Sequence, residues 1–450
     1  MLVGLDVGTT GVKSVVFDDC GTVLSSAFEE YPVDTGPEGK AQQNAEAVWK
    51  STRSVLVRSI LSCGIRMIKA IGLSVQGDAV IPVDANGNAL APALLGMDYR
   101  SAKAADEFSG MFGEKYLFRK TGMRPHAMNT ITKIRYFKTI EPEIFEKAAA
   151  FVTYAEFISM KLGGERVLDD SMASRTMAYD LEKSSWDSQL LTFAGVDERR
   201  MGKVRSSGTI IGILDSAIAH EAGLSGSTML CTGGHDQCCA ALGAGVIKPG
   251  SAVVSTGTAE VLSTCLDTVK VNDQMYNSYY PCYRHVVPDK YFTFSLNHIG
   301  GILLRWFKDT VCGREIEAAK AANMDIYHYL DTHMDKEPSD LFILPHFNGT
   351  GTPWCDMNAK GAIIGLTLST GVGQLYRSLL ESQTYELALN LEALSDAGID
   401  IHTISACGGG ARSAQWLQIK SDILNRPIQV PACNESAALG AAILAGTAIK

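Results

Sequence analysis

Apolar positions at the start of the chain follow a pattern that predicts strands joined by tight turns. Residues 2–8 form an apolar run, a Thr-Thr-Gly turn follows, and residues 12–18 form a second run. A third run spans residues 22–33, after a turn at 19–21. From residue 44 to 62 the apolar positions instead recur at the spacing of an amphipathic helix. We therefore predict a meander of strands followed by a helix.

The rest of the chain alternates between the same two kinds of element. Residues 229–247 read as a strand, a Gly-Gly turn and a helix of small residues, and residues 250–264 read as two strands joined by a turn. Long helical segments are expected near 297–322 and 370–396, and a strand at 401–410 leads into another helix. Mixed strands and helices of this kind predict an α/β protein.

One pattern occurs twice. Residues 4–18 and residues 250–264 both place a Gly-Thr turn between two apolar strands, near the start of each half. The repetition predicts two domains of similar architecture with a cleft between them, and we set them at residues 1–248 and 249–450. Because Gly-Thr turns are common in hairpins, the repeat on its own leaves a simpler explanation open.

Composition and charge exclude several classes of function. The chain has 450 residues, 46% hydrophobic and 20% charged, which is enough for two ordinary globular domains. A net charge of −9 without a basic block disfavours nucleic-acid binding. Eleven cysteines without a C-x-x-C pair favour reduced core thiols over disulfides or zinc. With no signal-peptide or membrane-span pattern, we expect a soluble, cytoplasmic protein.

The first turn carries groups that suit a phosphate. Its glycines allow successive N–H groups to point at one anion, its threonines add hydroxyl donors, and a lysine follows on the next strand. The candidate phosphate ligands are Gly8, Thr9, Thr10 and Lys13. Asp6 precedes the turn and could contact magnesium directly or through water, or simply cap the turn. The Walker sequence G-x-x-x-x-G-K-[ST] is absent.

Two further glycine turns lie in the second half. Gly257 and Thr258 could supply matching phosphate donors from the other domain. Gly408, Gly409 and Gly410 could let the backbone lie flat against an adenosine group. A tight connection between strand and helix is the alternative explanation for the three glycines.

Asp236 is the acid–base candidate. It follows two glycines at the predicted start of a helix, where the helix N-terminus favours its charged form. That form can accept the proton of a hydroxyl that attacks phosphorus. A helix N-cap is an equally good local explanation. We expect the neighbouring His235 to be structural.

Taken together, these segments resemble the FGGY carbohydrate kinase family, from GLDVGTTGVK to NESAALGAAILAG. Residues 349–368, GTGTPWCDMNAKGAIIGLTL, are also similar to its glycine-rich C-terminal signature. The resemblance implies two ribonuclease-H-like domains of the actin-like ATPase superfamily with an interdomain catalytic cleft. It also implies ATP-dependent phosphorylation of a hydroxyl of a sugar, ketose or polyol, with ATP and Mg²⁺ as cofactors.

The resemblance assigns roles to individual residues. Asp236 falls on the catalytic base, Gln237 on a substrate-contacting position and Asp6 on the magnesium side. The positions that match the family's phosphate and nucleotide contacts are Thr10, Lys13, Thr258, Gly301, Gly409 and Ser413.

The substrate loop departs from the best-known relatives. Residues 74–78 are Ser-Val-Gln-Gly-Asp, where glycerol kinases carry Asn-Gln-Arg-Glu and xylulose kinases Gly-Gln-Met-His. Gly96 replaces the tryptophan that usually precedes the family's Asp-x-Arg segment. Because Gly77 replaces an arginine, we predict a substrate larger than glycerol, of about four to six carbons, whose hydroxyls bond to carboxylates. The predicted substrate-binding residues are Gln76, Asp78, Asp98, Arg100 and Gln237.

An alternative of a different class is a catalytically degenerate, actin-like protein that binds ATP or a sugar as a regulator. The presence of Asp6 and Asp236 argues against it. The expected partner is a small sugar or polyol rather than nucleic acid or a membrane. The sequence leaves the sugar, the hydroxyl and the oligomeric state open, with a homodimer among the candidate assemblies.

Overall fold

The N-terminal sheet has six strands around a central β1. The computed structural model describes all residues from Met1 to Lys450. The strand order is β14 (Ile210–Ile213), β15 (Met229–His235), β6 (Ala70–Val75), β1 (Leu2–Val7), β2 (Gly11–Phe17) and β3 (Val23–Glu30). β1 runs antiparallel to β2 and parallel to β6. The Gly-Thr turn therefore lies at the end of β1, with the loop after β6 beside it.

The C-terminal sheet repeats this arrangement. Its order is β18 (Tyr283–Arg284), β19 (Tyr291–Asn297), β17 (Glu260–Leu266), β16 (Ser251–Thr256), β22 (Thr403–Gly408) and β23 (Ile428–Gln429). β16 runs antiparallel to β17 and parallel to β22, as β1 does to β2 and β6. The predicted α/β class and the two similar sheets are confirmed, and each Gly-Thr turn occupies the same place in its own sheet.

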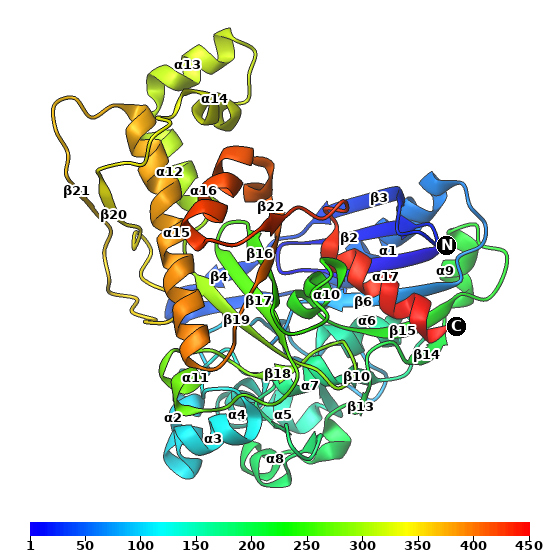
Figure 1. Cartoon of the computed structure of the whole chain (residues 1–450). Coiled ribbons are helices and arrows are strands. Elements are labelled where there is room, and N and C mark those ends of the chain that lie inside the picture. Colours follow the sequence, from blue (N-terminus) through cyan, green and yellow to red (C-terminus); the bar gives the residue numbers. More distant parts are fainter.

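Helices and short strands cover and connect the two sheets (Figure 1). In the first half the helices are α1 (Ala45–Cys63), α2 (Ala102–Phe112), α3 (Glu114–Thr121), α4 (Thr130–Ile140), α5 (Pro142–Lys147), α6 (Tyr154–Leu162), α7 (Asp170–Arg175), α8 (Ser188–Ala194), α9 (Ser216–Glu221) and α10 (Asp236–Gly243). In the second half they are α11 (Asp273–Asn277), α12 (Gly301–Val311), α13 (Gly313–Ala321), α14 (Ile326–His333), α15 (Val372–Asp396), α16 (Ala414–Leu424) and α17 (Ser436–Ala448).

The remaining strands form small sheets. These are β4 (Asp34–Gly36) with β5 (Lys40–Gln43) and β8 (Ala93–Leu94), β7 (Ile81–Val83) with β9 (Ala150–Val152), β10 (Val167–Asp169) with β13 (Lys203–Arg205), β11 (Tyr179–Asp180) with β12 (Ser185–Trp186), and β20 (Phe342–Leu344) with β21 (Ala362–Ile364). No helix has the length and apolar character needed to cross a membrane.

Most predicted elements are present, with two differences. The helical segment expected at 297–322 is divided, because α12 ends before Cys312 and α13 begins after it. The Gly-Gly turn expected before Asp236 is instead part of β15, which bulges between Cys231 and Gly234. A Cβ on Gly233 would lie 1.4 Å from the carbonyl oxygen of Leu73, so glycine here permits close strand pairing rather than a turn.

The last helix crosses to the N-terminal sheet. α17 packs against β1 and β6 and crosses α10 (Figure 1). The approach is close, since a Cβ on Gly4 would lie 1.8 Å from the carbonyl oxygen of Ala438. A Cβ on Gly440 would lie 1.9 Å from that of Cys239. By sequence α17 belongs to the second half, but its packing partners lie in the first, so it ties the two halves together.

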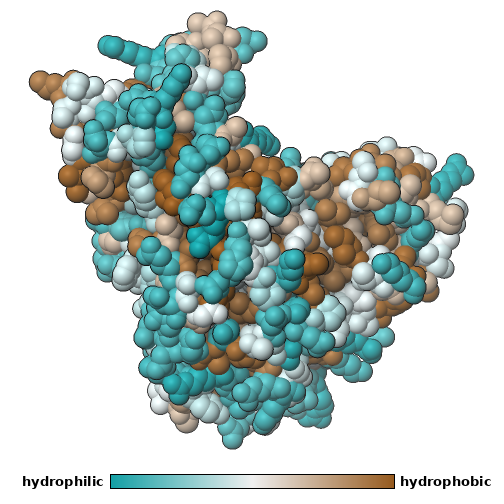
Figure 2. All heavy atoms as spheres, in the orientation of Figure 1, coloured by the Kyte–Doolittle hydropathy of each residue, from teal (hydrophilic) through white to brown (hydrophobic).

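The molecule is hollowed between its two lobes. Figure 2 shows the surface notched between the lobe that carries α13 to α16 and the lobe that carries β1 to β3. The glycine turns at the ends of β1 and β16 come from opposite lobes. This arrangement positions the site described next.

Candidate active site

Asp236 begins α10, directly after β15. Its Oδ1 accepts a hydrogen bond from the backbone N–H of Gln237 at 2.7 Å and lies 3.2 Å from Nε2 of His235. Burial raises the pKa of Asp236 to about 7, and the nearby negative charge of Asp6 adds to the effect. About 28% of the side-chain surface stays accessible. The carboxylate is thus held at one oxygen and still open to a ligand.

Asp6 lies at the end of β1 near Asp236. Its Oδ1 accepts a hydrogen bond from the hydroxyl of Ser74 at 2.6 Å, and burial raises its pKa. No group of three or more His, Cys, Asp or Glu side chains gathers into a metal cage. Magnesium on a nucleotide needs only one or two carboxylates, because phosphates and water supply the remaining ligands. A half-buried carboxylate with only one hydrogen-bonded partner therefore suits Mg²⁺ at Asp6.

The first glycine turn is braced from behind by polar side chains. The Tyr31 hydroxyl donates to the carbonyl oxygen of Gly8 at 2.6 Å, and Gln43 donates to that of Thr9 at 2.6 Å. Gln76 also donates to Gly8, at 3.2 Å. The turn's carbonyl groups are thereby engaged with the protein, while Thr10 remains exposed at the tip. Gln76, predicted to contact the substrate, is seen here bracing the phosphate turn.

Lys13 is paired rather than free. Its Nζ lies 2.9 Å from Oε2 and 3.0 Å from Oε1 of Glu435, the residue just before α17. Its side chain is about one-third exposed. A direct contact with phosphate stays a prediction, and in this structure the charge of Lys13 joins β2 to the last helix.

A cavity of about 870 Å³ opens in the C-terminal lobe beside the second glycine turn. The predicted nucleotide residues that line it are Gly257, Thr258, Gly301, Gly409 and Ser413. Gly408 is not part of this lining, although it sits just behind it. A Cβ on Gly408 would lie 2.6 Å from the carbonyl oxygen of Thr256, and its φ of 81° favours glycine. The volume and the lining suit a nucleotide.

A buried ion pair supports the second turn from below. Nζ of Lys420 on α16 pairs with Oε2 of Glu260 and donates to the hydroxyl of Thr256 at 3.1 Å. The Thr256 hydroxyl donates to the same Glu260 oxygen at 2.7 Å. The Lys420 and Glu260 side chains are only 2% and 1% exposed. The pair therefore fixes the turn relative to the helix that lines the cavity.

Asp78 carries an unused hydrogen-bond acceptor. Its Oδ2 pairs with the Arg175 guanidinium, whereas its Oδ1 is buried without a partner. Lys133 donates to its backbone oxygen at 3.0 Å, and burial lowers the pKa of that lysine to about 7. The backbone of Asp78 is in the left-handed region, with a φ of 65°. A buried acceptor of this kind suits a hydroxyl donor from a ligand.

The space beside Gly77 is filled by protein. A Cβ on Gly77 would lie 2.7 Å from Cδ2 of His235, so the missing side chain makes room for the histidine ring rather than for a substrate. The reason given above for a larger substrate is therefore wrong. Gly96 lies beside Asp78, because a Cβ there would meet the Cβ of Asp78 at an ordinary contact distance of 3.4 Å.

Asp98 is engaged by its neighbours. Its oxygens accept hydrogen bonds from Arg100, at 2.7 Å for the closest pair, and from the backbone N–H of Ala41 at 2.9 Å. Arg100 also donates to Oε1 of Gln42 at 3.0 Å. These contacts favour a role for Asp98 in holding Arg100. Contact of Asp98, Arg100 and Gln237 with a substrate stays a prediction.

Sequence reasoning missed the residues that support the site. They are Lys133, Arg175, Glu260, Tyr283 and Lys420, all buried. Four of them lie in a helix or strand without a motif of its own, whereas Glu260 directly follows the second glycine turn without any local sign of its distant partner. A charged residue at an otherwise buried helix position, as at Lys133, is the only sign that the sequence offers.

The whole chain matches known proteins. Models of the FGGY family of carbohydrate kinases match residues 1–243 with the N-terminal domain and residues 252–449 with the C-terminal domain. A gluconokinase of Bacillus subtilis (strain 168) is 30% identical over 98% of this chain and 86% of its own length. An autoinducer-2 kinase of Klebsiella pneumoniae is 28% identical over 99% of this chain and 85% of its own length.

A solved structure of a related protein has the same fold. The crystal structure of a xylulose kinase from Rhodospirillum rubrum superposes with a TM-score of 0.88 at 26% identity, covering 99% of this chain and 89% of that protein. Since both lobes match one family and its members share this fold, the chain belongs to the FGGY family of carbohydrate kinases and is itself a carbohydrate kinase.

Proposed function

We propose that this kinase transfers the γ-phosphoryl group of ATP to a hydroxyl of a polyol or ketose, with Asp236 as the general base. The observation that carries the proposal is that only one oxygen of the Asp236 carboxylate is held by a hydrogen bond. Oδ1 is held by the N–H of Gln237, which leaves Oδ2 to accept the substrate proton. A base with a pKa of about 7 is well matched to that task near neutral pH.

The two glycine turns would hold the phosphates from opposite lobes. Thr10 on the first turn and Thr258 on the second would donate hydroxyl hydrogen bonds, together with backbone N–H groups. Asp6 would hold Mg²⁺, which when bound neutralises charge on the transferring phosphoryl group. The adenosine part would occupy the cavity beside Gly409. Closure of the lobes would exclude water as a competing acceptor.

Asp78 would bind the sugar. Its unpaired Oδ1 would accept a hydrogen bond from a substrate hydroxyl, and the ion pair with Arg175 holds the carboxylate in place. Gly96 lies in ordinary contact distance of Asp78, so a bulky side chain at position 96 would crowd the carboxylate that we assign to the sugar. Relatives named gluconokinase, xylulose kinase and autoinducer-2 kinase fit a substrate larger than glycerol.

An ADP-release screen over polyols, ketoses, sugar acids and glycerol tests the proposal. We expect sugar-dependent ADP release with a polyol or ketose, requiring Mg²⁺. Glycerol as the best substrate would contradict the substrate class. The alternative of a degenerate regulator gains no support from relatives that are named as kinases. Nucleotide binding without turnover on any substrate would revive it.

A further inference from the structure

The backbone at Asp78 forms an unusual turn. The N–H of Ala79 donates to the carbonyl oxygen of Gly77 at 2.9 Å, and Asp78 between them has a φ of 65°. A hydrogen bond across three residues with a positive φ at the central one is the rare, strained form of the γ-turn. Because Asp78 has a Cβ, this conformation is unfavourable for it. Other parts of the protein must therefore hold the turn.

Two long side chains hold it. Lys133 belongs to α4 and Arg175 to α7, helices that lie in the lower part of Figure 1. The Lys133 amine donates to the carbonyl oxygen of Asp78 at 3.0 Å, and the Arg175 guanidinium pairs with its Oδ2. One contact fixes the main chain and the other fixes the side chain, while Oδ1 is left buried without a partner.

The Lys133 hydrogen bonds can run in one direction only. The amine also donates to the carbonyl oxygen of Met128, in the loop before α4. Because a carbonyl oxygen only accepts hydrogen bonds, the amine is the donor in both. A neutral amine still has two hydrogens, one for each carbonyl group, so the contacts do not depend on the charge of the lysine. Lys133 therefore joins the turn to the loop before α4.

Lys133 is fully buried without an ion pair of its own. Its neighbouring carboxylates, Asp78 and Asp98, pair with arginines instead. Such a place is costly for lysine, which is almost never fully buried unless it is paired. The costly lysine and the strained turn meet at one carbonyl group. Strained backbone that the surrounding structure holds in place is typical of sites that bind ligands.

We propose that Lys133 is a positioning residue for the sugar substrate. Its amine holds the turn at Asp78 in the strained conformation that presents Oδ1 to a substrate hydroxyl. Without that hydrogen bond the main chain relaxes toward a negative φ, and the Asp78 side chain leaves the place where Arg175 holds it. The inference rests on the proposed role of Asp78 in binding the sugar.

Lys133→Met tests the inference, because methionine is unbranched and fills most of the same space without a donor. We expect the KM for the best sugar to rise roughly 10- to 100-fold, the scale of leaving a buried acceptor unsatisfied, with the KM for ATP unchanged. Arg135→Met is the matched control. Arg135 lies on the same helix, but it donates to Glu107 at 2.8 Å and to the carbonyl oxygen of Phe193 at 2.9 Å. It should leave both KM values unchanged, even where it lowers Tm.

A mutant cycle separates positioning of Asp78 from general support of the helix. In an Asp78→Ala background the carboxylate is gone, so Lys133→Met should raise the sugar KM no further. If the methionine variant does not fold, Lys133→Gln replaces it, since its amide keeps N–H donors on a shorter chain and should raise the sugar KM by a smaller factor.

Three results would overturn the proposal. They are an unchanged sugar KM in the Lys133 variant, an equal rise in the KM for ATP, and an equal rise in the sugar KM with and without the Asp78 carboxylate. If Asp78→Ala alone keeps the original sugar KM, the proposed role of Asp78 fails instead, so the two failures are distinguishable.

Discussion

The buried Lys420–Glu260 ion pair allows us to predict how much its loss would destabilise the folded protein. Lys420→Met leaves Glu260 as a buried charge without a counterion, and its Oε1 already lacks a hydrogen-bond partner. Breaking a buried pair from one side costs about 3–5 kcal/mol in the free energy of unfolding. For a cooperative unit of about 200 residues this lowers Tm by roughly 6–20 °C. The turn at Thr256 also loses a bond, so ATP affinity should fall with it.

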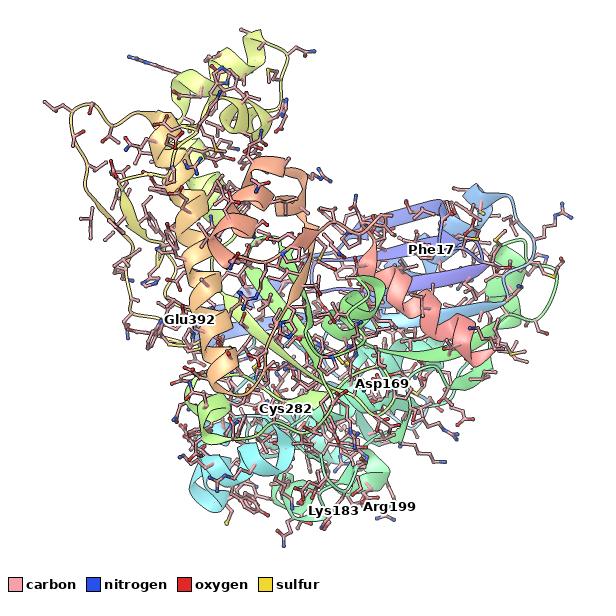
Figure 3. The ribbon with its side chains drawn as sticks, in the orientation of Figure 1. Phe17, Asp169, Lys183, Arg199, Cys282 and Glu392 are labelled. Carbon is pink, nitrogen blue, oxygen red and sulfur yellow. The ribbon has the colours of Figure 1, made fainter.

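Thermal unfolding followed by circular dichroism, with and without ATP, measures both effects. Lys420→Met combined with Glu260→Gln should recover much of the lost Tm, because the double variant leaves no uncompensated charge. Arg199→Met is the surface control, since Arg199 pairs with Asp197 but is 90% exposed, and its Tm should not change (Figure 3). A Lys420→Met protein that melts within about 2 °C of the unaltered one would refute the reasoning.

Three further predictions concern the reaction. Asp236→Asn should lower kcat by roughly 10²- to 10⁴-fold with ATP still bound in equilibrium dialysis, and turnover near the original rate would remove Asp236 as base. Because the base must be ionised and its pKa is about 7, kcat/KM should fall about tenfold per pH unit below 7. A rate that stays level to pH 5 would mean an ordinary pKa near 3.8. Gly96→Trp should raise the KM for the best sugar but not for ATP, and an equal rise in both would contradict a sugar-side role.

Much of the proposed nucleotide side could be predicted because its signals are local. Gly257, Thr258, Gly301, Gly409 and Ser413 lie in short glycine turns or at helix starts, and the structure brings them around one cavity. In such turns the chemistry depends mainly on backbone geometry, which glycine reveals in the sequence.

The proposed sugar side was harder to predict because its contacts are long-range. Asp78 meets Arg175 and His235 meets Tyr283 only after separate elements have packed together. Gly77 shows the same limit, since the sequence identifies a missing side chain but not the ring that fills its place. A single sequence marks where space is left and does not tell which distant residue takes it.

The crossing of α17 has a consequence for how the protein is made. Phe17 and Ala70, on strands near the start of the chain, are buried against Ala438 and Ala445 of this last helix (Figure 3). On the ribosome these strands emerge long before the helix that covers them. At a synthesis rate of roughly 5–20 residues per second, that face of the sheet waits on the order of tens of seconds for its partner. During that interval the nascent chain presents an apolar surface of the kind that chaperones bind.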